Sequence, residues 1–141
     1  MSRLATRETV RLRLRQAFDV WFAAHADHPF RAGIAGRLAY LRAPKRWARP
    51  YAVLSIPVAM EQSTLTERIY AVTVQIMVFA DASYEAEVLT SHALDLFEGQ
   101  RIPGERLKDF ELAQGGDVPT LPDEDEVWGA GVQLSGFVET A

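Results

Sequence analysis

The stretch from Ile69 to Gly99 constrains the fold more than any other part of this 141-residue chain. Its first part alternates apolar side chains with a mixed set. β-Branched and aromatic residues dominate, as a half-buried strand requires. The apolar face of this predicted strand is formed by Tyr70, Val72, Val74, Ile76 and Val78. A short polar turn, from Ala80 to Ser83, follows the strand.

Beyond the turn, apolar residues recur with the 3.6-residue period of an amphipathic helix. They are Ala86, Leu89, Ala93, Leu96 and Phe97. Asp81 or Ser83 is expected to cap the helix N-terminus, and Gly99 is expected to end the helix. We predict that this helix lies across the apolar face of the preceding strand and forms the centre of the domain.

The remaining elements are predicted on both sides of this unit. The segment from Thr6 to about Ala24 carries one apolar stripe at helical spacing. Tyr51 to Met60 alternates as a strand does, and should form an antiparallel hairpin with the strand at 69–79 through a polar tip at 61–67. The last strand is predicted from Val127 to Glu139.

Two connections between these elements are predicted to lack regular structure. Gln100 to Asp109 is polar and contains Pro103–Gly104, and Gly115 to Glu126 contains two prolines and an acidic run. The whole chain, residues 1–141, is therefore expected to be a single α+β domain. We expect a small antiparallel or mixed sheet, one helix packed across a sheet face, and an N-terminal helix.

The basic segment, residues 29–50, joins the first helix to the first long strand. It contains three prolines, two glycines and several arginines, and only its RLAYLR sequence suggests an extra helical turn or a short strand. We therefore expect an exposed basic arm or loop. Connectors of this length in a small domain usually have a function.

Charge is divided unequally along the chain. Residues 1–50 carry eleven Lys and Arg residues against three acidic residues, a net charge of about +8, whereas residues 51–141 carry four against sixteen, about −12. Opposite potentials on one surface leave two interpretations open. The basic half either binds nucleic acid or meets the acidic half of a neighbouring copy, and such head-to-tail contacts build rings.

The sequence contains no motif that points to catalysis or to a cofactor. His25, Asp27 and His28 have the residue types of a metal site, but no additional ligand lies at a spacing typical of such a site. Residues of these types also suit the end of a helix. Ser91 and His92 diverge on a helix and cannot form a catalytic dyad. There are no cysteines and no apolar run that resembles a membrane span. We expect neither an enzyme nor a membrane protein.

Charged side chains outside the predicted core are the candidate interaction residues. They are Arg7, Arg11 and Arg15 on one face of the first helix, Arg42, Arg46 and Arg49 in the basic segment, and the acidic run Asp123, Glu124, Asp125 and Glu126. The sharper interpretations of the arginines are contact with phosphates and docking onto an acidic neighbour. A solvated surface explains them equally well.

The order of elements resembles the tail-terminator, or tail-completion, proteins of long-tailed bacteriophages and related phage-like particles. Four segments carry the resemblance: ETVRLRLRQAFDVW, PYAVLSIP, VTVQIMVFADASYEAEVLTSHALDLFEG and WGAGVQLSGFVE. Other small phage neck and head–tail connector proteins share this size and pattern.

The resemblance implies a structural virion protein, assembled in the host cytoplasm and located in the tail or neck. It implies a homo-oligomeric ring, commonly a hexamer, that caps the tail tube, ends tube polymerisation and joins the tail to the head connector. Its expected partners are the tail-tube protein, the connector protein and DNA that passes through the channel. Another neck component, or a sequence-independent nucleic-acid-binding module, is the alternative.

Overall fold

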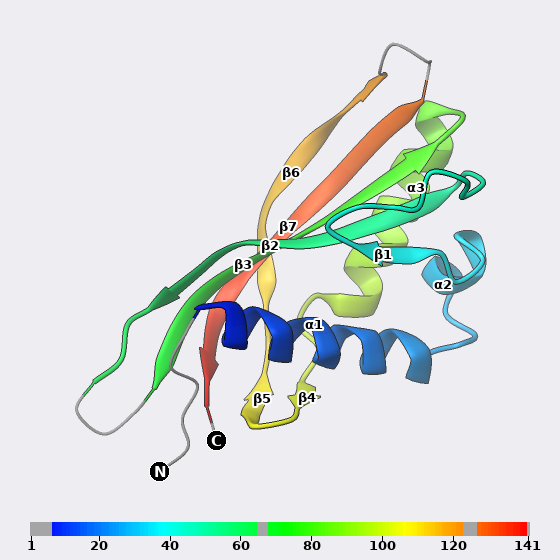
Figure 1. Cartoon of the computed structure of the whole chain (residues 1–141). Coiled ribbons are helices and arrows are strands. Elements are labelled where there is room, and N and C mark those ends of the chain that lie inside the picture. The colour runs from blue at the N-terminus through cyan, green and yellow to red at the C-terminus, as the bar shows by residue number, and fades with distance from the viewer. Residues whose placement is uncertain (1–6, 65–67, 123–126, 141) are drawn as a thin grey trace.

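The computed structural model describes residues 7–64, 68–122 and 127–140, without the side chains of residues 7–9, 119 and 120. Three helices, α1 (Arg7–Ala24), α2 (Pro29–Gly33) and α3 (Ser83–Phe97), accompany two sheets (Figure 1). The strands are β1 (Leu38–Tyr40), β2 (Tyr51–Glu61), β3 (Ile69–Ala80), β4 (Ile102–Gly104), β5 (Leu107–Phe110), β6 (Ala113–Pro122) and β7 (Trp128–Glu139). In the described part of the chain, no helix has the length and apolar character needed to cross a membrane.

The main sheet has the strand order β1-β2-β3-β7-β6. The three-residue β1 runs parallel to β2, and all other neighbours in this sheet are antiparallel. β3 and β7 pair without interruption over their whole length, from Ile69 opposite Glu139 to Ala80 opposite Trp128. The expected α+β class, with a mixed sheet and helices on one face, is confirmed.

One face of the sheet and all three helices enclose the hydrophobic core. The apolar set predicted for β3 is at most 2 % exposed, and the five predicted apolar residues of α3 are all buried against it. From α1, Phe18 is fully buried between Phe97, at 5.1 Å between ring centroids, and Phe110, at 6.0 Å. Offset aromatic contacts of this kind add to the burial of apolar area.

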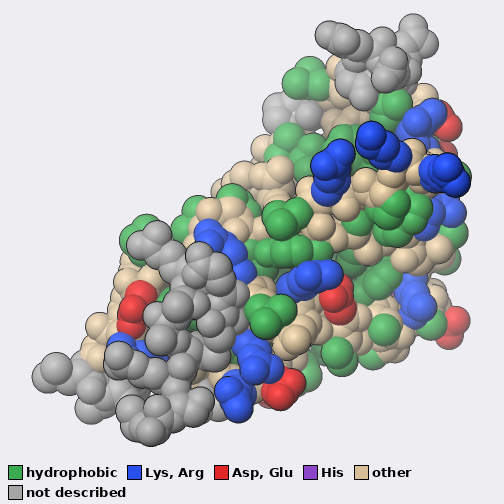
Figure 2. Space-filling model, in the orientation of Figure 1, with side chains coloured by type: hydrophobic (Ala, Val, Ile, Leu, Met, Phe, Trp, Pro, Cys, Tyr) green, Lys and Arg blue, Asp and Glu red, His purple; other side chains and the backbone are tan. Residues whose placement is uncertain are grey.

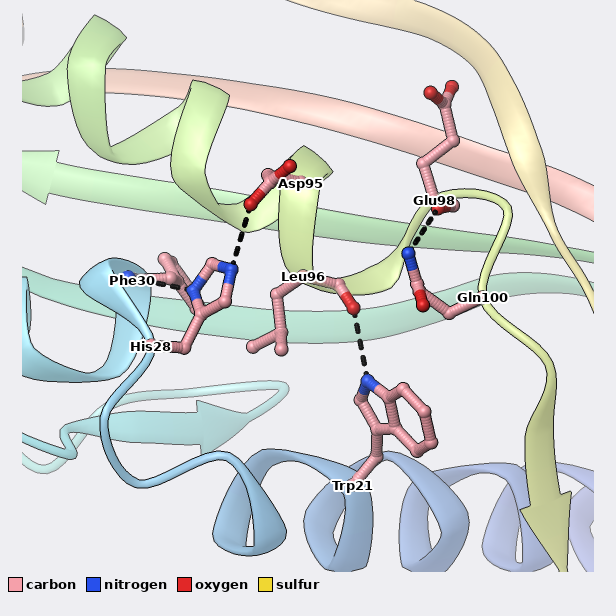
Figure 3. A network of polar contacts seen from close by, with 7 residues as sticks. All are labelled: Trp21, His28, Phe30, Asp95, Leu96, Glu98 and Gln100. Atoms are coloured by element: carbon pink, nitrogen blue, oxygen red, sulfur yellow. Dashed lines mark hydrogen bonds and ion pairs between the residues drawn. The ribbon is translucent and has the colours of Figure 1, made fainter.

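Polar contacts also join the helices to one another (Figure 3). The indole Nε1 of Trp21 on α1 donates to the backbone oxygen of Leu96 on α3 at 3.0 Å. His28 caps α2 by accepting from the amide of Phe30 at 3.1 Å, and its Nε2 lies 3.0 Å from a carboxylate oxygen of Asp95. Trp21 therefore joins α1 to α3, and His28 joins the turn after α1 to α3.

The basic segment differs from the expected arm. Its first half contains α2 and β1, and Phe30 and Ile34 are fully buried in the core. The short strand that RLAYLR suggested is β1, and the loop is confined to residues 41–50. An exposed arm over the whole of 29–50 is therefore wrong, because Phe30 and Ile34 bury their apolar side chains and so hold the first half of the segment against the core.

Three local expectations are also corrected. The N-cap of α3 is Ala82, which makes no side-chain cap, and Asp81 instead pairs with Arg49. The predicted Gly115–Glu126 loop is strand β6 as far as Pro122. Its Gly and Pro residues are tolerated because β6 is an edge strand with register shifts. The Gln100–Asp109 connection forms the β4–β5 hairpin, which buries Ile102 and Leu107.

Candidate assembly interface

The second face of the main sheet carries no helix in the described part of the chain, because α1, α2 and α3 all bury their apolar side chains on the opposite face. We call this second surface the open face. Cross-strand rows define it: Tyr51 with Phe79, Val53 with Met77, Ser55 with Gln75 and Gln133, Thr73 with Ser135, and Met60 with Ala71 and Phe137. Most of these side chains are only partly covered, by their neighbours in the sheet.

The polarity of the side chains changes along the open face. Its centre is polar, since Gln133 donates to Gln75 at 3.1 Å and the hydroxyls of Thr73 and Ser135 lie 3.2 Å apart. The end near the β2–β3 hairpin tip is apolar and accessible. Val58, Met60 and Phe137 there are 39 %, 49 % and 62 % exposed. Exposed apolar residues that gather on one surface are typical of a protein–protein contact.

The other end of the open face contains a hollow of about 390 Å³. Its floor and walls come from β2, β3 and the start of the 41–50 loop: Leu41, Arg42, Ala43, Tyr51, Val53, Ser55, Gln75, Met77 and Phe79. Glycines on β7 help to form this surface. A Cβ at Gly131 would lie 2.3 Å from Met77 Sδ, and one at Gly129 would lie 3.2 Å from the Phe79 ring. Met77 and Phe79 can therefore lie across β7 rather than project from the sheet.

The basic loop, residues 41–50, borders this hollow. Arg42, Lys45 and Arg46 are exposed, and their side chains make no ion pair or hydrogen bond with any residue that the structure describes. Arg49 is different, because its Nε lies 2.6 Å from Asp81 Oδ1. Figure 2 shows Lys and Arg side chains gathered beside hydrophobic side chains on this side of the molecule, with few acidic groups. The surface combines apolar area with net positive charge.

The arginines predicted on one face of α1 have separate roles in the structure. Arg11 donates from Nε to the Ile56 oxygen at 2.8 Å and from Nη2 to the Pro57 oxygen at 3.3 Å, where β2 has its register shift. Arg15 remains exposed, 3.8 Å from Asp19 and 4.7 Å above the Tyr40 ring. The side chain of Arg7 lies outside the described residues.

The acidic candidates Asp123, Glu124, Asp125 and Glu126 also lie outside the described residues. Acidic groups do gather on a described surface that the sequence did not single out. The exposed residues of α3 are Tyr84, Glu85, Glu87, Ser91 and Asp95. This helix contains neither Lys nor Arg. Tyr84, at 76 % exposure, is the most exposed of the large hydrophobic residues in the described chain.

The histidines near the end of α1 make contacts with protein groups. His25 Nδ1 lies 2.7 Å from the Trp21 oxygen, and its ring lies against the Trp21 indole at 4.3 Å between centroids. His28 binds the Phe30 amide and Asp95, as described above. No cluster of three or more His, Asp or Glu residues suited to a metal is found among the described residues.

Asp19 on α1 is the carboxyl group whose ionisation the fold perturbs. Partial burial raises the pKa of Asp19 above its ordinary value of 3.8, and the positive charge of Arg15 opposes that rise without cancelling it. Its carboxylate is thus a mild cost to the fold at neutral pH. Among the residues that the structure describes, Arg15 is the one ion-pair partner of Asp19.

Comparison with known proteins gives one informative result. No protein-family model matches the chain, and no curated protein matches it in sequence. Among solved structures, the fold is similar to that of a chain in the structure described as the virion of a native gene transfer agent (GTA) particle. The TM-score is 0.73, with 18% sequence identity, and the match covers 89% of this chain and 96% of that chain. At this level of identity, the likeness shows that the fold is shared over nearly the full length of both chains.

Proposed function

We propose that this chain is a structural virion protein of the tail-terminator kind. Several copies form a ring, in which six is the commonest number for the family, at the end of a phage or phage-like tail tube. The ring ends tube polymerisation and joins the tail to the head connector, and DNA passes through its channel. The observation that carries the proposal is the shared fold with a chain of a GTA virion over almost the whole length of both chains.

Two features of the surface support assembly as the task of this fold. No helix of the described residues covers the open face of the sheet, which has exposed Val58, Met60 and Phe137 at one end and a hollow beside a basic loop at the other. The exposed basic residues of the 41–50 loop and the acidic residues of α3 lie on different elements, which suits a heterologous contact between identical subunits. The absence of catalytic motifs in the sequence agrees with a structural role, and we propose that the protein is not an enzyme.

The test combines the purified chain with a tail-tube protein from the same source. Light scattering after size-exclusion chromatography and negative-stain microscopy measure self-association and ring formation. Polymerisation of the tube protein, followed by electron microscopy, measures tube length with and without the chain. We expect rings, and tubes that stop growing once one end is occupied. A chain that stays monomeric on its own and with tubes, and leaves tube length unchanged, would refute the proposal.

Sequence-independent nucleic-acid binding is the second candidate. It is favoured by Arg42, Lys45 and Arg46 of the 41–50 loop beside Trp47, whose side chains have no charged partner in the described part of the chain. Exposed Lys and Arg give binding that weakens steeply with salt. Filter binding with DNA at low and high salt separates the two functions. Salt-sensitive binding that is lost in an Arg42→Ala, Lys45→Ala, Arg46→Ala variant, in a chain that never caps tubes, would favour this second function.

A further inference from the structure

Two surfaces of the chain complement each other, and they lie on opposite sides of the main sheet. The first is the hollow on the open face together with the basic loop. The second is the outer surface of α3, which packs through its buried side chains against the other face of β3 and β7. Figure 1 shows α3 behind the strands, whereas the loop before β2 lies in front of them.

The charges of the two surfaces match. On the basic loop, Arg42, Lys45 and Arg46 have no charged partner among the described residues. On α3, Glu85 and Glu87 likewise have none in the described part of the chain. Unpaired charges of opposite sign, on opposite sides of one molecule, attract successive copies head to tail.

The shapes of the two surfaces also match. Tyr84, next to these glutamates, projects from the first turn of α3 with 76 % of its surface exposed. The hollow beside the basic loop is lined mostly by apolar and aromatic side chains, among them Leu41, Tyr51 and Met77, with Arg42, Ser55 and Gln75 as its polar members. Its volume of about 390 Å³ is more than a single tyrosine side chain needs. Tyrosine in an apolar pocket, surrounded by complementary charge, is a frequent anchor of protein–protein interfaces.

We propose that a second copy of this chain occupies the hollow on the open face. Tyr84 of one copy enters the hollow of the next, and Glu85 and Glu87 pair with the basic loop around it. The contact joins two different surfaces of identical chains, so a bound pair leaves one surface of each kind free for further copies. Such a contact closes into a ring when its rotation allows. The inference rests on the proposed ring, and it names the surfaces that form it.

Cysteine cross-linking tests the contact directly, because the natural chain has no cysteine. Lys45→Cys and Glu87→Cys variants are prepared separately and treated with a short bis-maleimide, alone and mixed. We expect cross-linked dimers only in the mixture. The double variant should give a ladder of higher oligomers. A mixture of Lys45→Cys with Glu111→Cys is the matched control. Absence of the mixed dimer, or dimers formed as readily by one variant alone, would overturn the proposal.

Charge reversal and rescue provide the second arm. Arg42→Glu, Arg46→Glu should weaken self-association at least tenfold, and so should Glu85→Arg, Glu87→Arg. When the two reversed proteins are mixed, they should associate again. The reversed loop of one protein then meets the reversed helix of the other, and the two natural surfaces also meet. Sedimentation velocity measures association, and circular dichroism verifies that each variant is folded.

Truncation of the anchor completes the test. Tyr84→Ala should weaken association at least tenfold, whereas Tyr84→Phe should keep most of it. Val20→Ala, which truncates an exposed apolar residue on α1, is the control.

Tube capping is measured on the same proteins, so that failure of the proposed contact can be distinguished from failure of the proposed function. A natural chain that forms rings and caps tubes, with reversed variants that still associate, overturns this contact and leaves the proposed function intact. A natural chain that neither associates nor caps tubes overturns both.

Discussion

Replacement of Arg11 by alanine tests whether this arginine serves the fold of one chain or the contact between chains. Its guanidinium donates to the backbone oxygens of Ile56, at 2.8 Å, and Pro57, at 3.3 Å. These oxygens lie where β2 has lost its regular register and where the short β1 no longer accompanies it. Arg11 thus satisfies acceptors at a strand edge that no neighbouring strand can reach.

The expected loss follows from the two hydrogen bonds. A bond from a charged donor contributes about 1.5 to 3 kcal/mol, and the lower end applies to the half-buried contact with Ile56. The longer bond to Pro57 is exposed and adds about 0.5 kcal/mol. We expect Arg11→Ala to lower the free energy of unfolding by about 2 kcal/mol. For a chain of this size, that is a fall in the melting temperature of about 7 °C.

Urea unfolding followed by circular dichroism, at a concentration where the chain is monomeric, measures this loss. Arg15→Ala is the matched control, one helical turn away. Its ion pair at 3.8 Å and its position over Tyr40 are exposed, so we expect a loss of about 0.5 kcal/mol. An Arg11→Ala chain as stable as the natural one, but defective in self-association, would show that the reasoning is wrong and that Arg11 is an interface residue.

Three other substitutions test separate parts of the fold. Phe18→Ala empties the contact between α1, α3 and β5, and should cost about 4 kcal/mol in urea unfolding; a cost below about 1 kcal/mol would contradict the core described here. Gly131→Ala places a Cβ 2.8 Å from the Ile76 oxygen, so we expect a loss of about 2 kcal/mol, and an unchanged midpoint would refute the close approach. Asp19→Asn tests the raised pKa of the Asp19 carboxyl. The natural chain binds this proton more tightly when folded than when unfolded, so its stability falls as pH rises above 3.8. The asparagine variant has no such proton and does not lose stability for this reason. The variant should therefore gain stability relative to the natural chain between acidic and neutral pH, modestly because Asp19 is 60% exposed, and a constant difference over that range would contradict the sign of the shift.

Periodic segments were predicted well because their pattern reports burial directly. The β3 face and the α3 stripe bury the residues that the spacing indicated, and α1 buries its predicted stripe except for Trp21, which is only partly buried. The predictions failed where the residue types favour one local structure and tertiary contacts impose another. β6 contains Gly115, Gly116 and two prolines, which favour a loop, yet it pairs with β7 as an edge strand. The α3 cap failed because Asp81 binds Arg49, a residue distant in the sequence.

The candidate interface was likewise predicted only in part from the sequence. The sequence alone identified the unequal charge, the basic segment and the two-sided pattern of the central strand. It treated Arg7, Arg11 and Arg15 as one group, because helical spacing cannot reveal that Arg11 meets strand carbonyls 45 residues away. It also passed over Tyr84, whose exposure depends on how α3 is rotated against the sheet.

Local patterns were therefore sufficient to predict the long periodic elements, the α+β class and the buried face of the central strand, since each depends on the period of apolar residues along one segment. Only the tertiary structure decided what packs on each face of the sheet, which charges are already paired, and which surfaces lie opposite each other. These properties arise from contacts between residues far apart in the chain. They are the ones on which assembly with another copy depends.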